Sequence, residues 1–263
     1  DLVKAMFADT GFRDRVSLSA VNSINWVRII AQTVYYVVTA LRLGAPDRSV
    51  GFSVPTGNFG NIYAAFVARN LGVPIEKLII GTNRNDILAR YFEAGEMRLS
   101  GVEPSLSPSM DIQVSSNFER LLFEMLDRDG ARVADIMTGF RRDGAFTTDP
   151  DRLARITGLF HAYRASDELT TKTIQEVYQT TGQVIDPHTA AGVAATKQFR
   201  VANPDMDLPI VSLACAHPAK FPDAVEAAVQ VTPSLPPHLS DLYDRQERMT
   251  VLDNDLAVIE AHI

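Results

Sequence analysis

The sequence TGNFGN at residues 56–61 is the stretch whose residue types and spacing most favour chemistry. It follows a short apolar run at residues 50–54, typical of a buried strand, and precedes a run of helical spacing that Gly72 and Pro74 close. Two glycines three apart let backbone N–H groups approach a ligand that a Cβ would obstruct. A strand, a glycine loop and a helix in this order direct N–H groups and the helix dipole at one point, which predicts a phosphate site.

The sequence of this loop limits the kind of phosphate-bearing ligand that it could bind. No GK[ST] follows it, which argues against a nucleotide triphosphate, and its GxxG differs from the dinucleotide fingerprint GxGxxG. A small monophosphate cofactor fits better. The alternative is an ordinary turn between a strand and a helix, in which glycine serves only the geometry.

A second candidate anion site lies at the start of a long predicted helix, residues 22–44. Asn22 or Ser23 can cap this helix, Asn25 offers an amide, and Arg28 stands one turn in. Amide donors, a helix N-terminus and a guanidinium could converge on an anion. A capped helix with a surface arginine is the alternative.

Two further groups of polar residues have a structural interpretation. Ser116 and Glu119 form a capping-box pattern for a helix at 117–126, so Ser115, Ser116 and Asn117 are predicted as caps and turns rather than catalytic groups. Asp186 and Pro187 begin another helix, in which several alanines predict close approach to a neighbouring element. His188 has no evident carboxylate partner in the sequence, so we expect a structural or supporting role. No histidine spacing indicates a metal site.

The elements that must position these residues alternate between strands and helices. Apolar runs at 78–81 and 209–214 predict two more buried strands, and the alternation indicates an α/β fold with an open, mainly parallel sheet and helices on both faces. The loop CAHPAKF at 215–221 would lie at the carboxyl end of a strand, where open α/β sheets bind ligands. Cys215 could equally be a small buried apolar residue.

Composition excludes several classes of protein. The chain has 263 residues, enough for a large core, and a net charge of −7 without basic runs, which argues against nucleic acid and acidic membranes as partners. A small-molecule substrate is therefore expected. A single cysteine and the absence of a signal-peptide pattern favour the cytoplasm. The helical pattern beginning at Asp1, without methionine, is expected to continue from a longer chain.

Five motifs in a fixed order carry a resemblance to a known family. AVNSINWVRI, SVPTGNFGNI, SPSMDIQVSSNFERLLF, DPHTAAG and CAHPAKF closely resemble the threonine synthases, pyridoxal-phosphate enzymes of the tryptophan-synthase-β-like fold, also called PLP fold type II. The likeness runs from Leu2 to about Val231, and the part between residues 84 and 166 is the least diagnostic.

This resemblance implies a function and a set of site residues. The reaction would be conversion of O-phosphohomoserine and water to threonine and phosphate, with pyridoxal 5'-phosphate as cofactor. Asn22, Ser23 and Arg28 match the residues that hold the substrate phosphate, and Cys215 stands where the family has a threonine that contacts the pyridine nitrogen. A thiol is a poorer hydrogen-bond partner, so this contact would be weaker. The cofactor phosphate would be held by Gly57, Asn58, Phe59, Gly60 and Asn61.

The resemblance also implies how the chain is organised. Residues 1–21 would end an upstream small domain, 22–231 would form the cofactor-binding large domain with an insertion at about 84–166, and 232–263 would be a tail with a helix. The Schiff-base lysine would lie upstream, so this chain alone would be inactive. The oligomer would be a monomer or homodimer. Alternatives are a serine or threonine dehydratase of the same fold, and an anion-binding homologue without catalysis.

Overall fold

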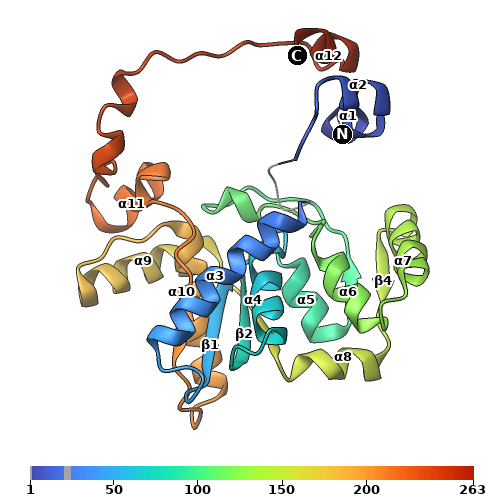
Figure 1. Cartoon of the computed structure of the whole chain (residues 1–263). Helices are drawn as coiled ribbons and strands as arrows, with labels where there is room; N and C mark the ends of the chain where they lie inside the picture. The colour runs from blue at the N-terminus through green and yellow to red at the C-terminus, as the bar shows by residue number, and fades with distance from the viewer. Residues whose placement is uncertain (1, 21–24) are drawn as a thin grey trace. The chain divides into compact units, whose positions relative to one another are not determined.

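The computed structural model describes residues 2–20 and 25–263 (Figure 1). They form two compact units, one of residues 26–234 and one that combines the two ends of the chain, up to residue 25 and from 235 to 263. No helix within the described ranges is both long and apolar enough to cross a membrane.

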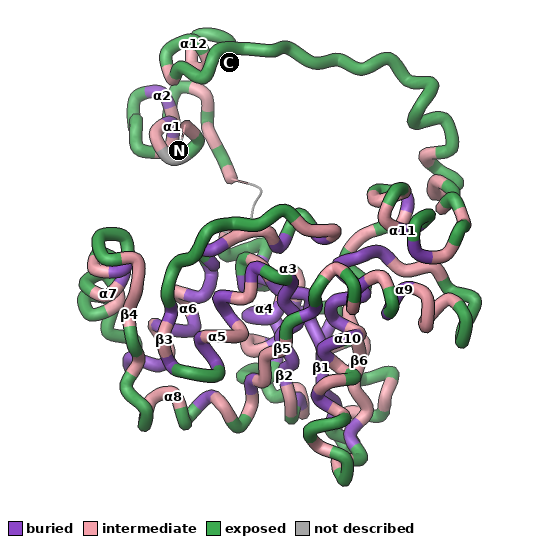
Figure 2. The backbone as a smooth tube through the Cα atoms, turned by 180° about the vertical axis from the view of Figure 1, so that it is seen from behind, coloured by how far each residue is buried: buried purple, intermediate pink, exposed green. Residues whose placement is uncertain are grey.

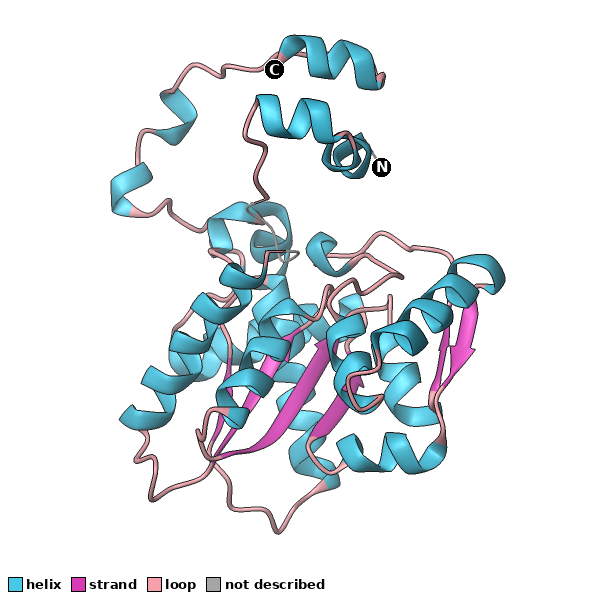
Figure 3. Ribbon diagram, turned by 45° about the vertical axis from the view of Figure 1, so that its right-hand side comes forward, coloured by secondary structure: helices cyan, strands magenta, loops and turns pink. Residues whose placement is uncertain are grey.

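A four-stranded parallel sheet lies at the centre of the larger unit (Figure 3). Its order is β5-β2-β1-β6, and Phe52 of β1 pairs with Leu78 of β2 on one side and Val211 of β6 on the other. Both central strands are almost wholly buried, which explains their continuous apolar sequence. The strands are β1 (Val50–Pro55), β2 (Ile75–Thr82), β5 (Phe160–Arg164) and β6 (Ile210–Ser212).

Helices cover both faces of this sheet, which confirms the predicted fold class. Phe52, Val54 and Ile80 point into the main core, shared with α3 and α4, whereas Ile79 packs with residues of α10 on the opposite face. This alternation follows from the two-residue period of a strand. Buried residues concentrate in β1, β2, α4 and α10 (Figure 2).

The remaining elements of this unit surround the sheet. A short antiparallel pair joins β3 (Glu96–Arg98) to β4 (Ala145–Thr147) beside α5 and α7. The α-helices are α3 (Trp26–Arg42), α4 (Gly60–Asn70), α5 (Ile87–Ala94), α6 (Phe118–Met125), α7 (Gly130–Asp143), α8 (Pro150–Thr157), α9 (Asp167–Thr181), α10 (Pro187–Ala202) and α11 (Pro222–Val229).

The segment at 84–166, expected to be an insertion, contributes to the core of the fold. Its last part is β5, which pairs in parallel with β2 along five residues and forms an edge of the main sheet. Tyr91, Phe118 and Phe140 in this segment are fully buried in the main core. The expectation of an insertion was wrong because the burial of this segment depends on contacts with residues distant in the sequence, such as the pairing of β5 with β2.

Helix α3 buries only one of its apolar sides. Val27, Val34 and Leu41, which recur every seven residues, are exposed in the structure. The side that packs against α4 and β1 is instead formed by Ile29, Thr33, Tyr36 and Ala40. Both sides of the helix are therefore apolar.

The smaller unit consists of short helices from both ends of the chain. They are α1 (Leu2–Ala8), α2 (Thr10–Arg15) and α12 (Leu256–His262), with Met6 and Phe12 buried and α12 in contact with α1. Asp9 caps α2 by accepting a hydrogen bond from the N–H of Phe12 at 2.9 Å. The two ends of the chain, which we expected at 1–21 and 232–263 as separate segments, thus form one unit, apart from residues 232–234, which belong to the larger unit.

Candidate functional site

The glycine loop, residues 56–61, joins β1 to α4 as predicted. The N–H of Thr56 continues the sheet by donating to the carbonyl of Gly81 at 2.8 Å. Phe59 then adopts a left-handed conformation with φ of 64° and its ring is buried against Phe118 and Phe160. A residue other than glycine rarely takes this conformation, so the aromatic contacts hold a strained backbone at the start of α4.

The carbonyl groups of the glycine loop are bound by the segment that precedes α6. Ser115 Oγ donates to the Gly57 carbonyl at 2.7 Å, and Asn117 donates to the Asn58 carbonyl from both its backbone N–H and its side-chain amide, at 3.1 and 3.0 Å. The predicted capping box is therefore wrong, because Ser116 points to Asn58 and Asn117 makes no side-chain cap. The sequence showed these polar residues but not the loop that they contact.

The N–H groups of the glycine loop have no acceptor among the residues that the structure describes. Within residues 25–263, no protein acceptor is found for the backbone N–H groups of residues 57–61. Asn61 is fixed by Tyr36, whose hydroxyl donates to the Asn61 carbonyl at 3.0 Å and to its Oδ1 at 2.8 Å. Unpaired N–H groups at a helix N-terminus can bind an anion, and the phosphate site expected at residues 57–61 stays a prediction.

A polar turn lies directly on the glycine loop. A Cβ added to Gly57 would come within 3.0 Å of the Ser109 carbonyl, so this glycine allows the close approach. The turn is held by Asp111, whose Oδ1 accepts hydrogen bonds from Asn83 at 2.7 Å and Asn85 at 2.9 Å. Asn83 and Asn85, which follow β2, thus shape the site and are already occupied by this carboxylate.

A buried cluster of Asp186, His188 and Thr189 forms the start of α10, and we call it the Asp186 cluster. Asp186 accepts from the N–H of His188 and from its Nδ1, both at 2.9 Å, and also from the Thr189 hydroxyl. His188 Nε2 accepts from the N–H of Ser109 at 3.2 Å, which assigns the ring proton to Nδ1. His188 therefore has the carboxylate partner that the sequence did not reveal.

The Asp186 cluster also holds the loop that contains Cys215. The N–H of Cys215 donates to Thr189 Oγ1 at 3.1 Å. Burial opposes ionisation of Asp186, but hydrogen bonds from His188 and Thr189 lower its pKa below the usual range. The cluster thus connects an ionised carboxylate to both the Ser109 turn and Cys215.

Cys215 follows β6 and lies near the carboxyl ends of the parallel strands. Although the residue is exposed, desolvation by nearby protein atoms and then the charge of Asp186 raise the pKa of its thiol. The thiol is therefore neutral at physiological pH. The alternative of a buried apolar cysteine does not hold, because the residue reaches the surface.

The second predicted anion site is only partly within the described residues. Asn22 and Ser23 lie outside them. Arg28 is exposed in the first turn of α3. Trp26, two residues before it, packs edge to face with Tyr63 of α4, with ring centroids 6.2 Å apart. No group of three or more His, Cys, Asp or Glu residues suited to a metal occurs in the part of the chain that the structure describes.

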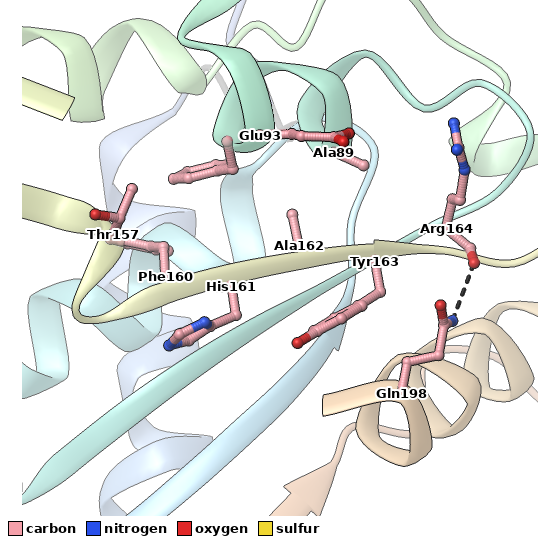
Figure 4. Close-up of a pocket in the computed structure, with 10 residues that line it drawn as sticks. Ala89, Glu93, Thr157, Phe160, His161, Ala162, Tyr163, Arg164 and Gln198 are labelled. Carbon is pink, nitrogen blue, oxygen red and sulfur yellow. Dashed lines mark hydrogen bonds between the residues drawn. The ribbon is translucent and has the colours of Figure 1, made fainter. Parts of the chain in front are cut away.

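A separate groove of about 350 Å³ runs along the open edge of β5 (Figure 4). Phe160, His161 and Tyr163 line it from the strand, and Gln198 of α10 donates to the Arg164 carbonyl at 3.0 Å across one end. None of the residues predicted for the site lines this groove. It is therefore distinct from the glycine loop and the Asp186 cluster.

Comparisons with known proteins show which sequences and structures the chain is similar to. A family model described as "Threonine synthase, C-terminal" matches residues 189–263. The threonine synthase of Pseudomonas aeruginosa is 51% identical over 264 residues, which cover 100% of this chain and 56% of the relative. That of Saccharomyces cerevisiae is 38% identical, covering 99% and 54%.

Solved structures show the same likeness. The PLP-bound threonine synthase from Brucella melitensis superposes with a TM-score of 0.92 at 52% identity, covering 99% of this chain and 55% of that chain. Threonine synthase from yeast gives 0.87 at 36% identity, covering 100% and 56%. The likeness extends beyond Val231, its expected end, to the last residue.

The chain thus spans about half the length of the relatives that it matches. Over that length it has the α/β architecture of PLP fold type II. In both sequence and fold, these 263 residues match one part of a threonine synthase.

Proposed function

We propose that the chain is part of a threonine synthase, which converts O-phosphohomoserine and water to threonine and phosphate with pyridoxal 5'-phosphate. The observation that carries this proposal is the glycine loop, whose carbonyls are bound by Ser115 and Asn117 while its N–H groups have no acceptor within residues 25–263. The match to threonine synthases along the whole chain supports the choice of cofactor and reaction.

The glycine loop would bind the phosphate of the cofactor. Its backbone donors carry no net charge and lie at the N-terminus of an eleven-residue helix, so they can bind a phosphate dianion without a lysine or arginine. The cofactor, when bound, supplies an electron sink, and the protein orients it. Gly57, Asn58, Phe59, Gly60 and Asn61 are the proposed ligands.

The test of this function uses the full-length enzyme that contains the chain. Phosphate released from O-phosphohomoserine should depend on added pyridoxal phosphate. Cofactor binding, seen by its absorption, without phosphate release but with ammonia release from serine would indicate the dehydratase. Absence of cofactor binding would leave the anion-binding homologue.

Arg28, with Asn22 and Ser23, would bind the phosphate of the substrate. A charge-assisted hydrogen bond contributes ~1.5–3 kcal/mol, so Arg28→Ala should raise KM for O-phosphohomoserine at least tenfold and weaken inhibition by phosphate. A dehydratase would not need this arginine. An unchanged KM and unchanged phosphate inhibition would reject the assignment.

Cys215 would face the pyridine nitrogen of the cofactor. Its neutral thiol would leave this nitrogen largely unprotonated, whereas a carboxylate would stabilise a pyridinium by opposite charge. Cys215→Thr should therefore keep activity within about tenfold, a difference of ~1.4 kcal/mol, and Cys215→Asp should shift the cofactor absorption. Free alkylation of Cys215 with unchanged absorption and turnover would show that it does not line the site.

The lysine that would bond the cofactor is proposed to lie in the part of the enzyme that this chain does not span. Among the lysines whose side chains the structure describes, Lys77 donates to the Gly158 carbonyl at 2.8 Å and Lys197 pairs with Glu176. Borohydride reduction with pyridoxal phosphate, followed by peptide mapping, tests this. One stoichiometric label within the 263 residues, together with turnover, would contradict it.

The remaining expectations concern the class of substrate, the location in the cell and the oligomeric state. A small-molecule substrate fits the anion sites. The cytoplasmic location and the choice between monomer and homodimer stay predictions.

A further inference from the structure

Helix α3 presents an apolar stripe on the side that faces away from the sheet. Its members recur at intervals of four, three, four and three residues, and Val27, Val34 and Leu41 are 70%, 56% and 58% exposed. No charged residue interrupts α3 between Arg28 and Arg42. We call Val27, Ala31, Val34, Val38 and Leu41 the outer stripe.

The outer stripe is the main exposed apolar surface of the larger unit. Of the twelve large apolar side chains exposed among residues 26–234, seven lie on α3. The surface continues past Leu41 to Leu71, which is 70% exposed, and into an apolar groove of about 270 Å³ between the end of α3 and the turn after α4. Apolar surface gathered in this way marks an interaction site.

The spacing of the stripe indicates what covers it. Intervals of four and three residues form the narrow seam by which one helix packs against another. A helix that is apolar on all sides is either a membrane span or a helix in the interior of a larger protein. The membrane alternative is excluded for α3, because none of the described helices is long and apolar enough to span a bilayer.

We infer that the outer stripe is covered by an apolar helix from the part of a threonine synthase that these 263 residues do not span. The relatives are matched over only 56% of their length by a chain that is itself fully matched, so nearly half of such an enzyme is available to cover it. A second copy is less suited, since a stable dimer buries ~800 Å² per partner and five side chains of one helix offer a small seam. A segment of the same polypeptide needs no such area, because its effective concentration is high.

This inference depends on the match to threonine synthases and not on the reaction. It can therefore fail while the proposed activity stands, and the reverse also holds. Its test measures accessibility in the full-length enzyme and does not involve turnover.

The test compares two single cysteine variants of the full-length enzyme, Val34→Cys in the outer stripe and Val201→Cys on α10. Val201 is 83% exposed and belongs to none of the proposed sites. Alkylation by a maleimide, followed by peptide mapping, should be at least tenfold slower at position 34 than at position 201.

Two outcomes would overturn the inference. Equal alkylation of both cysteines in the full-length enzyme would show that the stripe is open to solvent. Protection of position 34 that disappears on dilution would show that a second copy covers it. As an independent measurement, Val34→Asp should lower Tm of the full-length enzyme by ~5 °C or more, while Val201→Asp should leave it nearly unchanged.

Discussion

The glycine loop and the Cys215 loop both follow strands of one parallel sheet, yet they are held by different chemistry. The glycine loop is bound through its carbonyls by neutral hydroxyl and amide groups, Ser115 and Asn117. The Cys215 loop depends on an ionised carboxylate, since its N–H donates to Thr189, which donates to Asp186. Among the described residues, the first arrangement leaves the N–H donors of the loop without acceptors, and the second places negative charge close to a thiol.

The largest loss of stability is expected from a change to Asp186, the carboxylate on which the Cys215 loop depends. Asp186→Ala removes a fully buried acceptor of hydrogen bonds from His188 and Thr189, so we expect the free energy of unfolding to fall by ~3 kcal/mol. The control is Asp149→Ala at the exposed start of α8, which should cost about 1 kcal/mol as an ordinary cap. Urea unfolding measures both, and equal losses would refute a special role for the cluster.

The Asp186 carboxylate also makes the stability of the protein depend on pH. Because the folded-state pKa of Asp186 is lowered, its contribution to stability is present above its unfolded value of about 4 and is lost as pH falls through the lowered pKa. Asp186→Asn should therefore flatten the loss of stability in acid.

The next effect concerns the approach of the Ser109 turn to the glycine loop. Gly57→Ala would place a methyl group 3.0 Å from the Ser109 carbonyl and 3.2 Å from the Met110 Cα, so we expect a loss of ~1–3 kcal/mol and weaker pyridoxal phosphate binding. Gly139→Ala within α7 meets no atom within 4 Å and should be stabilising by ~0.5–1 kcal/mol. Should the two variants bind the cofactor equally, the turn would not control the loop.

A smaller loss of stability is expected where neutral side chains hold the glycine loop. Ser115→Ala removes the hydrogen bond to the Gly57 carbonyl and should cost about 1 kcal/mol at every pH between 5 and 8. Ser116→Ala loses only an exposed contact of 3.4 Å and should be nearly neutral. If the stability lost in Ser115→Ala varied with pH, the glycine loop would be coupled to the Cys215 loop and its carboxylate.

The smallest effect is expected from His161, which adds its own pH dependence to the stability measured for the other variants. His161 packs against Phe199 with ring centroids 5.0 Å apart, and burial, followed by the charge of Lys77, lowers its pKa. Since the unfolded pKa is about 6.5, stability should decrease as pH falls below that value and through the lowered pKa. His161→Phe keeps the ring contact and should remove this part of the profile, as thermal unfolding at pH 8 and pH 5 would show.

The sequence predicted the elements of the site better than the contacts between them. The glycine loop, the strands at 50–54 and 78–81 and the helix begun by Asp186 all appear in the structure, because each has a local signal of spacing or capping. The buried strand predicted at 209–214 is found only in part, since β6 spans Ile210–Ser212 and is half-buried at the edge of the sheet. The close approach expected from the alanines of α10 is also found, since a Cβ at Gly81 would lie 2.9 Å from the Ala191 carbonyl.

The parts that could not be predicted depend on contacts between distant residues. Ser115 and Asn117 show a capping pattern locally, and only the fold brings them to Gly57 and Asn58, almost sixty residues away. Likewise α3 has two apolar sides, and periodicity cannot say which one faces the sheet. The carboxylate partner of His188 is two residues away, but only the turn at the helix start directs both groups inward.

The contact between α10 and the sheet has a consequence for how this protein tolerates sequence change. At Gly81 and Gly192 the neighbouring atoms are backbone and a proline ring, with distances from an added Cβ of 2.9 and 3.0 Å, so no flexible side chain separates the two elements. Ser53 Oγ reinforces the contact by donating to the Gly192 carbonyl at 2.7 Å. Elsewhere in the core, side chains can repack around a substitution. The distance between α10 and the sheet cannot adjust in this way, because no flexible side chain lies at the contact. The separation of α10 from β1 and β2, and with it that between the glycine loop after β1 and the Asp186 cluster at the start of α10, should change little as the sequence drifts.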